Sequence, residues 1–346
     1  MLKKLIQLAE KGILPDRLIR LGINHLNKIR LKQAKVLGPE EVSKKHQEWV
    51  EKLMASPLAL VPEKANEQHY EVPPKFFELV LGSNLKYSSG FWGNGIKTLD
   101  QSEELMLSLT CERAELENGQ SILELGCGWG SLTCFMGKNF PDSKIVAVSN
   151  SNDQKIFIQQ KCSELKLNNI EVIKADMNDF SINKTFDRVV SVEMFEHMRN
   201  YDLLLKRIHN WLNNDGKLFV HIFSHKELAY PFENKSDGDW MAREFFSGGQ
   251  MPSHQLLLHF QNHMKIESLW RLDGTHYEKT SLAWLIKMDK NKSKILKIFS
   301  ETYGNDNAKK WFQRWRIFFM SCEGLFGYNN GIEWGVSHYR FQKMKD

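Results

Sequence analysis

Five short apolar segments alternate with helical segments between residues 119 and 225, and this alternation constrains the fold more than any other feature. In chain order, the apolar segments are SILEL, KIVAVSNS, IEVIKAD, FDRVVSVEM and GKLFVHIFS. Apolar runs separated by helices of about 10–15 residues are typical of parallel strands that are buried on both faces. The alternation therefore predicts a doubly wound α/β core built on a parallel sheet.

The residues before this core predict a small helical region. Apolar side chains recur at helical spacing over residues 2–10 and 17–31. A third helix is expected over about residues 39–54, because the sequence GPEE supplies a proline and two acids suited to a helix N-terminus. We interpret residues 56–66, which contain two prolines and little periodicity, as a connector. Residues 1–75 are therefore expected to form a basic helical region that precedes the core.

The residues after the core predict two more strands, HMKIESLWRL and SHYRFQKM, with helices between them. Pairing of these two strands would extend the sheet and cover one of its edges. The helices between them would then form an insertion over about residues 278–325. On this interpretation the α/β core comprises residues 119–277 together with 326–346.

The net charge of +5 is concentrated at the N-terminus. Residues 1–50 contain eleven Lys or Arg and five Asp or Glu, a surplus of six, so the other 296 residues sum to −1 (5 − 6). This distribution argues against a nucleic-acid-binding groove across the protein. No window of 18 uncharged apolar residues occurs, so no transmembrane helix is expected.

The five cysteines are scattered and form neither a CxxC pair nor a metal-ligand spacing. An odd, dispersed set of this kind is typical of free thiols in a reducing compartment. We therefore expect no metal site, no disulfide framework and a cytoplasmic location. The oligomeric state is left open by the sequence, with a homodimer as one alternative.

A glycine-rich loop, Glu124-Leu-Gly126-Cys-Gly128-Trp-Gly130, follows the first strand of the core and opens a helix. Glycines at alternate positions allow the backbone to approach a ligand closely, and the helix N-terminus supplies free amides. The spacing differs from the dinucleotide fingerprint GxGxxG and leaves no room for a pyrophosphate. It suits a smaller cofactor made of an amino acid joined to a nucleoside, and a tight turn that binds no ligand is the alternative.

This loop resembles the first motif of the S-adenosylmethionine-dependent methyltransferases with a Rossmann-like fold. The segment VSVEMFEHM is similar to the branch that holds cyclopropane-fatty-acid synthases, mycolic acid methyltransferases and coclaurine N-methyltransferases. Segments such as YEVPPKFFELVLGSNLKYSSGFW and LFGYNNGIEWGVSH extend the resemblance over nearly the whole chain, most closely to the coclaurine N-methyltransferase pattern. The resemblance implies S-adenosyl-L-methionine as the cofactor, and residues 76–118 as a cofactor cover followed by a lead-in helix.

The resemblance also implies which residues bind the cofactor. The glycine loop would contact its methionine part, the polar residues after the second strand would hold the ribose in place of an acid, and Asp176 with Met177 would meet the adenine. Ser88, with Tyr87 beside it, matches a segment that folds over the cofactor, although Tyr87 could equally be a packing residue. The implied set is Tyr87, Ser88, Glu124, Gly126, Cys127, Gly128, Ser149, Asn150, Gln154, Asp176, Met177 and Val192.

Glu193, Glu196 and His197 follow the fourth strand of the core, where ligands bind in open α/β sheets. Methyl transfer needs an acceptor with a free lone pair, yet an aliphatic amine is mostly protonated near neutral pH. We therefore predict that Glu196 and His197 act as a general base and its partner, and that Glu193 pairs with the incoming cation. The alternative is that these side chains only hold the loop by hydrogen bonds.

Two acceptor classes remain open on this reasoning. A small-molecule amine is favoured because the lipid-modifying relatives generally carry glycine where this chain has Glu193. In cyclopropane synthases a bound bicarbonate acts as the base, and His221 and Tyr277 stand at what look like its binding positions, with Cys322 at the position of a family cysteine. An unsaturated acyl lipid is thus the alternative acceptor, and the basic N-terminal helices would suit peripheral contact with an anionic membrane.

Aromatic residues cluster near the C-terminal end of the predicted helical insertion. We expect this insertion to form a lid or wall of the acceptor pocket, with ordinary helical packing as the alternative. The residues concerned are Trp311, Phe312, Trp315, Phe318, Phe319 and Phe326.

Overall fold

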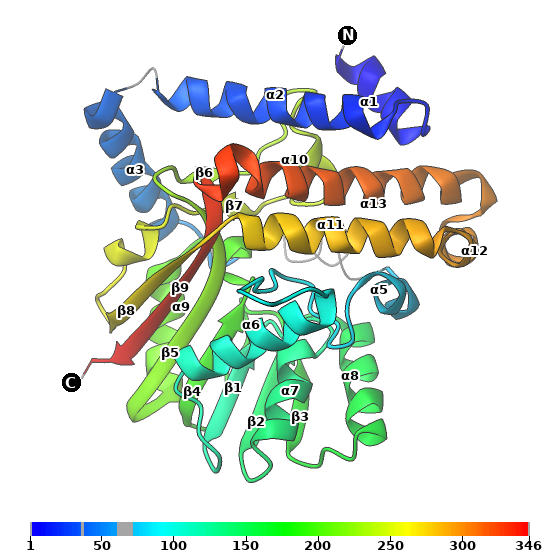
Figure 1. Ribbon diagram of the computed structural model, residues 1–346. Helices are drawn as coiled ribbons and strands as arrows, with labels where there is room; N and C mark the ends of the chain where they lie inside the picture. The colour runs from blue at the N-terminus through cyan, green and yellow to red at the C-terminus, as the bar shows by residue number, and fades with distance from the viewer. Residues whose placement is uncertain (1, 36–37, 61–71, 345–346) are drawn as a thin grey trace.

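The computed structural model describes residues 2–35, 38–60 and 72–344. Its centre is a seven-stranded sheet with the order β3-β2-β1-β4-β5-β9-β8 (Figure 1). Strands β1 to β5 are parallel, and β9 is antiparallel to both β5 and β8, which confirms the predicted α/β core and the closing pair of strands. The strands are β1 (Ser121–Leu125), β2 (Lys144–Ser149), β3 (Ile170–Lys174), β4 (Phe186–Val192), β5 (Leu212–His225), β8 (Met264–Asp273) and β9 (Trp334–Lys343).

Helices cover both faces of the sheet, as the apolar runs require. Ile122 of β1 packs in one cluster with α6 (Leu99–Arg113) and α7 (Ser131–Asn139). Leu123 and Leu125 of the same strand pack in another cluster with α9 (Tyr201–Trp211). Helix α8 (Asn152–Glu164) connects β2 to β3 and packs on α7. The side chains on both faces of β1 are therefore buried.

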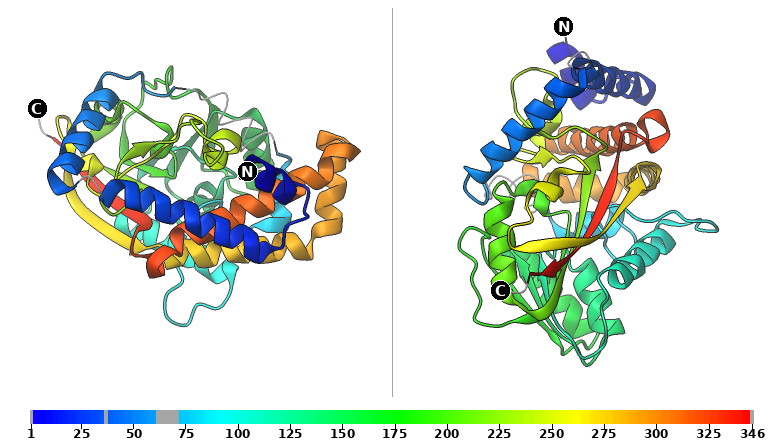
Figure 2. Two further views of the ribbon diagram at one scale, coloured as in Figure 1. Left: turned by 90° about the horizontal axis from the view of Figure 1, so that it is seen from above. Right: turned by 90° about the vertical axis from the view of Figure 1, so that its left-hand side faces the viewer.

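Three helices form the N-terminal region, close to the positions that the sequence predicts: α1 (Leu2–Glu10), α2 (Asp16–Lys35) and α3 (Gly38–Met54). Figures 1 and 2 show α2 on the outside of the molecule, alongside helix α13 (Asn305–Phe326). The Arg20 guanidinium donates to both carboxylate oxygens of Glu323, with the shortest contact at 2.7 Å. Most of the predicted connector 56–66 lies outside the described residues.

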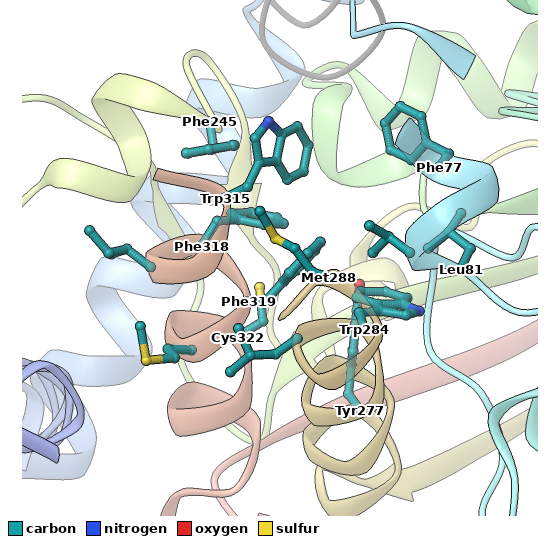
Figure 3. Packing of buried hydrophobic residues seen from close by; sticks show 14 of the residues in the cluster. Phe77, Leu81, Phe245, Tyr277, Trp284, Met288, Trp315, Phe318, Phe319 and Cys322 are labelled. Carbon is teal, nitrogen blue, oxygen red and sulfur yellow. The ribbon is translucent and has the colours of Figure 1, made fainter. Parts of the chain in front are cut away.

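The helical insertion between β8 and β9 consists of α11 (Thr275–Lys290), α12 (Lys292–Tyr303) and α13. Its inner face packs against the short helix α5 (Pro74–Val80). In Figure 3, Trp315, Phe319 and Cys322 of α13 face Trp284 and Met288 of α11 across an apolar core. The division of the chain into the four parts expected from the sequence remains our interpretation.

One segment carries structure that the sequence analysis does not predict. Between β5 and β8 lie α10 (Trp240–Glu244) and a small two-stranded sheet formed by β6 (Tyr230–Pro231) and β7 (Gln250–Met251). Three 3₁₀ turns complete the described elements: Phe195–His197, Leu256–His259 and Tyr328–Gly331. Strands of two residues give no periodic signal, so this segment could not be recognised from the sequence.

Candidate active site

A cavity of about 760 Å³ lies at the carboxyl ends of β1, β2, β3 and β4. This is the crevice in which open α/β sheets bind ligands. Nine of the predicted site residues line it: Gly126, Gly128, Ser149, Asn150, Gln154, Asp176, Met177, Glu193 and His197. We call it the first cavity.

The glycine loop forms one wall of the first cavity in a conformation that favours glycine. Gly126, Gly128 and Gly130 all have positive φ values, of 80°, 51° and 79°. A Cβ atom at Gly126 would lie 2.7 Å from the Cβ of Met194, whereas a Cβ at Gly128 would meet no protein atom within 4 Å. Gly128 thus borders open space in the cavity wall. This space leaves room for a ligand close to the Gly128 backbone, which is the role that the glycine spacing predicts.

A side-chain amide at the start of α8, just after β2, lines the first cavity. The Ser149 hydroxyl donates to Oε1 of Gln154 at 2.6 Å, and the backbone N–H of Gln154 donates to the Ser151 hydroxyl, which caps α8. These contacts fix the Gln154 amide, while its buried Nε2 has no hydrogen-bond partner among the described residues. A buried donor without a partner is costly, and a hydroxyl-rich ligand such as a ribose would satisfy it.

Six other predicted residues are described but lie outside the wall of the first cavity. Tyr87 packs among Phe77, Trp284 and Trp315, and the Ser88 hydroxyl accepts a hydrogen bond from buried Lys86. The Glu124 carboxylate is buried and accepts from the Thr133 hydroxyl at 2.5 Å, and burial raises its pKa to about 8. The remaining three are Cys127, Val192 and Glu196. The roles inferred for these six toward a ligand stay predictions.

Glu193 is held in a strained backbone conformation at the bottom of the first cavity. Its φ is +48°, a region that non-glycine residues rarely adopt, and its N–H donates to the backbone oxygen of His221 at 2.8 Å. Its carboxylate accepts hydrogen bonds from the Tyr277 hydroxyl at 2.7 Å and from the Ser89 N–H at 3.2 Å. Burial raises the pKa of Glu193, but Lys86, Tyr277 and Ser89 counteract this shift.

Glu196 is in a different environment. Its side chain is buried, and its Oε2 has no hydrogen-bond partner among the described residues. Burial and the neighbouring Glu193 carboxylate raise the pKa of Glu196 well above its usual range. The pKa of Glu196 is therefore shifted further upward than the pKa of Glu193, so Glu193 is the more easily ionised of the two.

His197 lines the first cavity, where its ring is neutral. Burial lowers the pKa of His197 to about 4. Its ring stacks on Phe246 with centroids 5.6 Å apart and planes inclined by 5°. An imidazole with this pKa is uncharged near neutral pH. The neighbouring Glu193 carboxylate raises the pKa of the ring and so opposes the effect of burial.

A second cavity, of about 1080 Å³, adjoins the first through two side chains. Phe246 and Tyr277 line it, and these are the residues that stack on His197 and donate to Glu193. Most of its wall is apolar and comes from α2, α13 and the segment that contains β6, α10 and β7. The second cavity is therefore suited to an apolar or aromatic molecule whose polar end reaches Glu193.

The aromatic insertion contributes less to this wall than the sequence predicts. Phe318 and Phe326 line the second cavity. Trp315 and Phe319 are instead part of the apolar core between α5, α11 and α13 (Figure 3). Phe312 belongs to the same cluster, and Trp311 stacks on Tyr303. The helical-packing alternative is thus correct for four of the six aromatic residues.

Several residues of the site were not predicted. Ala59, Met194, Met198, Ser247 and Gly248 also line the first cavity. Apart from the pair of glycines at 248–249, they carry no chemical signal in the sequence. Among the residues that the structure describes, no group of acidic, histidine or cysteine side chains could hold a metal ion, and no helix is long and apolar enough to cross a membrane.

Comparison with known proteins agrees with this geometry. The profile of the mycolic acid cyclopropane synthetase family matches residues 61–331. The chain is 38% identical to (S)-coclaurine N-methyltransferase from Papaver somniferum, over 99% of this chain and 98% of that protein. A crystal structure of coclaurine N-methyltransferase bound to N-methylheliamine and SAH superimposes with a TM-score of 0.95 at 36% identity, covering 98% of this chain and 99% of that one.

A lipid-modifying relative is more distant. Cyclopropane-fatty-acyl-phospholipid synthase from Escherichia coli K12 is 28% identical over 75% of this chain and 63% of the relative. The chain therefore belongs to the mycolic acid cyclopropane synthetase family of methyltransferases, and within that family it groups with the coclaurine N-methyltransferases.

Proposed function

We propose that this chain transfers the methyl group of S-adenosyl-L-methionine to the nitrogen of a small-molecule amine that carries an aromatic or otherwise apolar body. One observation carries the proposal: the Glu193 carboxylate lines the first cavity and is bonded to Tyr277, which lines the second. A carboxylate at this junction can pair with a cationic amine that enters from the second cavity.

The residues of the first cavity fit the cofactor. The open space at Gly128 leaves room for the methionine part, Ser149, Asn150 and Gln154 offer hydroxyl and amide groups to a ribose, and Asp176 with Met177 offers an acceptor and an apolar surface to an adenine. When bound, S-adenosylmethionine supplies a methyl group on a positively charged sulfur. The match to a methyltransferase that binds SAH supports the same assignment.

Different polar residues bind the acceptor amine and remove its proton. Glu193 pairs with the ammonium form of the acceptor and orients it, and the His197 ring, whose pKa the Glu193 carboxylate raises against the effect of burial, relays the proton away from the nitrogen, which leaves a lone pair there. The nitrogen then attacks the methyl carbon as the carbon–sulfur bond breaks, and S-adenosylhomocysteine is the second product. The raised pKa of Glu196 favours its protonated form, which reduces the repulsion between Glu196 and the Glu193 carboxylate.

Methylene or methyl transfer to an unsaturated acyl chain is the alternative function, and the arrangement of Glu193 disfavours it. His221 and Tyr277, the residues expected to hold a bicarbonate base in the lipid branch, are within hydrogen-bond distance of the Glu193 carboxylate instead. Cys322 lines the second cavity, and burial raises the pKa of its thiol, so it is a poor nucleophile.

The outer face of α2 has residues that are suited to peripheral contact with a membrane. Leu18 and Leu21 are more than half exposed beside Arg17 and Lys28, and the inner face of the same helix lines the second cavity. Basic and apolar residues on one helix face are suited to weak contact with an anionic membrane. We place the enzyme in a reducing compartment, the cytoplasm, because its five cysteines are free thiols.

The test is methyl transfer from cofactor labelled on its methyl group. The acceptors are a panel of primary, secondary and tertiary amines with aromatic bodies and, separately, vesicles of unsaturated phospholipid. We expect label in the amine products. Label that appears only in lipid would overturn the proposal in favour of the alternative function.

A further inference from the structure

A continuous chain of hydrogen bonds runs from Glu193 along one face of the sheet to the end of α6. His221 Nε2 lies 3.3 Å from Glu193 Oε1, and His338 Nε2 lies 2.9 Å from His221 Nδ1. Arg113 Nη1 lies 2.8 Å from His338 Nδ1. The antiparallel register of β5 and β9 places His221 directly opposite His338, so the contact between the two rings is built into the sheet.

The chemistry of arginine fixes the direction of this chain. A guanidinium only donates hydrogen bonds, so Nδ1 of His338 must accept and its ring proton must be on Nε2. That proton is donated to Nδ1 of His221, whose own proton must then be on Nε2, where it points at Glu193. One arginine therefore sets the tautomers of two histidines, and both donors point toward the active site.

The surroundings keep both imidazoles neutral, as this direction requires. His221 and His338 are fully buried, and burial lowers the pKa of both rings well below the usual range. Lys86 and Arg113 lower the pKa of each ring further by charge repulsion. Neutral imidazoles can donate and accept at once, whereas an imidazolium at position 338 could not accept from Arg113.

Several other titratable groups face Glu193. Lys86 lies in the segment before α6, Tyr277 on α11, Cys322 on α13, and Glu196 with His197 in the turn after β4. Of these, Lys86 and Tyr277 favour the ionised form of Glu193, and the raised pKa of Glu196 favours its protonated form. The donor from His221 adds to the stabilisation by Lys86 and Tyr277.

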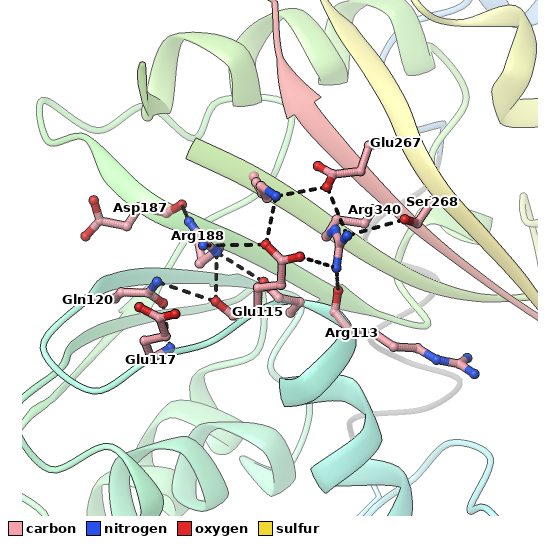
Figure 4. Close-up of polar contacts among 11 residues, drawn as sticks. Arg113, Glu115, Glu117, Gln120, Asp187, Arg188, Glu267, Ser268 and Arg340 are labelled. Atoms are coloured by element: carbon pink, nitrogen blue, oxygen red, sulfur yellow. Dashed lines mark hydrogen bonds and ion pairs between the residues drawn. The ribbon is translucent and has the colours of Figure 1, made fainter. Parts of the chain in front are cut away.

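The far end of the chain is anchored at the surface. Arg113 is partly exposed at the end of α6, and its guanidinium lies 4.8 Å from the centre of the Trp270 ring. Figure 4 shows its backbone oxygen accepting from Arg340, which also pairs with Glu115 and Glu267. These contacts hold Arg113 at a fixed distance from His338, so the chain of hydrogen bonds has a rigid starting point.

We propose that His338 and Arg113 are positioning residues for the methyl transfer: acting through His221, they fix the donor that holds the Glu193 carboxylate toward the acceptor amine. The proposal rests on the proposed function, because it concerns the carboxylate that pairs with the amine. Neither residue contacts either cavity, and their effect depends entirely on the tautomer of His221.

The loss of either residue has a defined consequence. Without Arg113 the ring of His338 can reverse its tautomer, His221 then reverses as well, and a lone pair faces the Glu193 carboxylate in place of an N–H. Losing a donor disfavours the ionised form of Glu193, so its pKa rises. The acidic limb of the kcat/KM profile should therefore move to higher pH.

The experiment compares Arg113→Met with Arg113→Lys, which keeps a cationic donor. We expect Arg113→Met to lower kcat/KM for the amine about tenfold near neutral pH and to move the acidic limb upward, while Arg113→Lys stays within about threefold of wild type. His338→Phe should behave like Arg113→Met. Cofactor affinity should remain unchanged in all three variants.

A second readout is independent of activity. The ¹⁵N shifts of the His221 ring in the wild-type protein should show the Nε2–H tautomer, and Arg113→Met should produce a mixture. An unchanged pH profile in Arg113→Met and His338→Phe would overturn the proposal, as would an Nδ1–H tautomer in wild type. If the wild type methylates no amine, the proposed function fails, and the ring tautomer still decides whether the chain of hydrogen bonds is directed as described.

Discussion

The two cavities of this enzyme are built in different ways. The first is lined largely by residues that directly follow β1 to β4, so the lining residues form short groups that are contiguous in the sequence. The second combines side chains from three parts of the chain. These are α2, the segment that contains β6, α10 and β7, which lies about 200 residues later, and α13, which lies tens of residues beyond that segment. A site on strand ends is fixed by the sheet, whereas a site between helices and loops changes with any one of its segments. The cofactor half is thus the more constrained part, and the acceptor half is free to vary.

Glu193 belongs to both halves. Its backbone follows β4 and lines the first cavity, while its carboxylate is bonded to Tyr277 of the second. The experiments below test whether the halves can be changed separately, beginning with the change expected to have the largest effect.

Gly128→Val should abolish cofactor binding, because a branched side chain would fill the open space beside the loop and strain a residue whose φ is +51°. Isothermal calorimetry with S-adenosylhomocysteine measures the effect. Gly119→Val is the matched control, because Gly119 also has a positive φ and open space but lies outside both cavities. Unchanged affinity in Gly128→Val would show that the glycine loop does not hold the cofactor.

His197→Ala should lower turnover by about a hundredfold and leave cofactor affinity within about threefold, because the base is lost and the glycine loop is untouched. Glu196→Gln should cost about tenfold at most, since an amide resembles the protonated carboxyl that burial favours at this position. Steady-state rates with a labelled cofactor measure both. A larger loss in Glu196→Gln than in His197→Ala would mean that Glu196 acts as the ionised base.

Leu26→Ala should raise the KM for the amine several-fold without changing cofactor affinity, because Leu26 lines the second cavity from the inner face of α2. Leu21→Ala on the outer face of the same helix is the control and should leave both constants unchanged. Equal effects of the two substitutions would remove α2 from the acceptor site.

Glu124→Gln should have the smallest effect, on stability alone. The folded pKa of Glu124 is about 8, above the usual value of 4.5, so the folded state holds this proton more tightly than the unfolded state. Stability from this group is complete below pH 4.5 and is lost as the pH rises toward 8. Glu124→Gln should therefore gain about 1 kcal/mol or more relative to wild type between pH 5 and pH 8. Urea denaturation at the two pH values measures this, and a parallel pH dependence in both proteins would contradict the assignment.

The same contrast explains what could be predicted from the sequence. The strands and the glycine loop follow from patterns within about ten residues, so local reasoning locates them. The predicted cofactor residues of the first cavity come from the resemblance to the methyltransferase family. The second cavity depends on contacts such as that of Arg20 with Glu323, which no local pattern encodes. His338 lies in a predicted strand, but only the register of β9 against β5 places it on His221. The protonation of Glu196 likewise depends on burial, which its sequence neighbours do not reveal.

The central claim is that Glu193 connects the two halves by pairing with the amine. The most direct test measures cofactor affinity and amine methylation separately in Glu193→Gln. The account predicts cofactor affinity within about threefold of wild type and a loss of amine methylation of about a hundredfold, because an amide cannot balance the charge of an ammonium group. Unchanged methylation, or an equal loss of cofactor affinity and turnover, would contradict it.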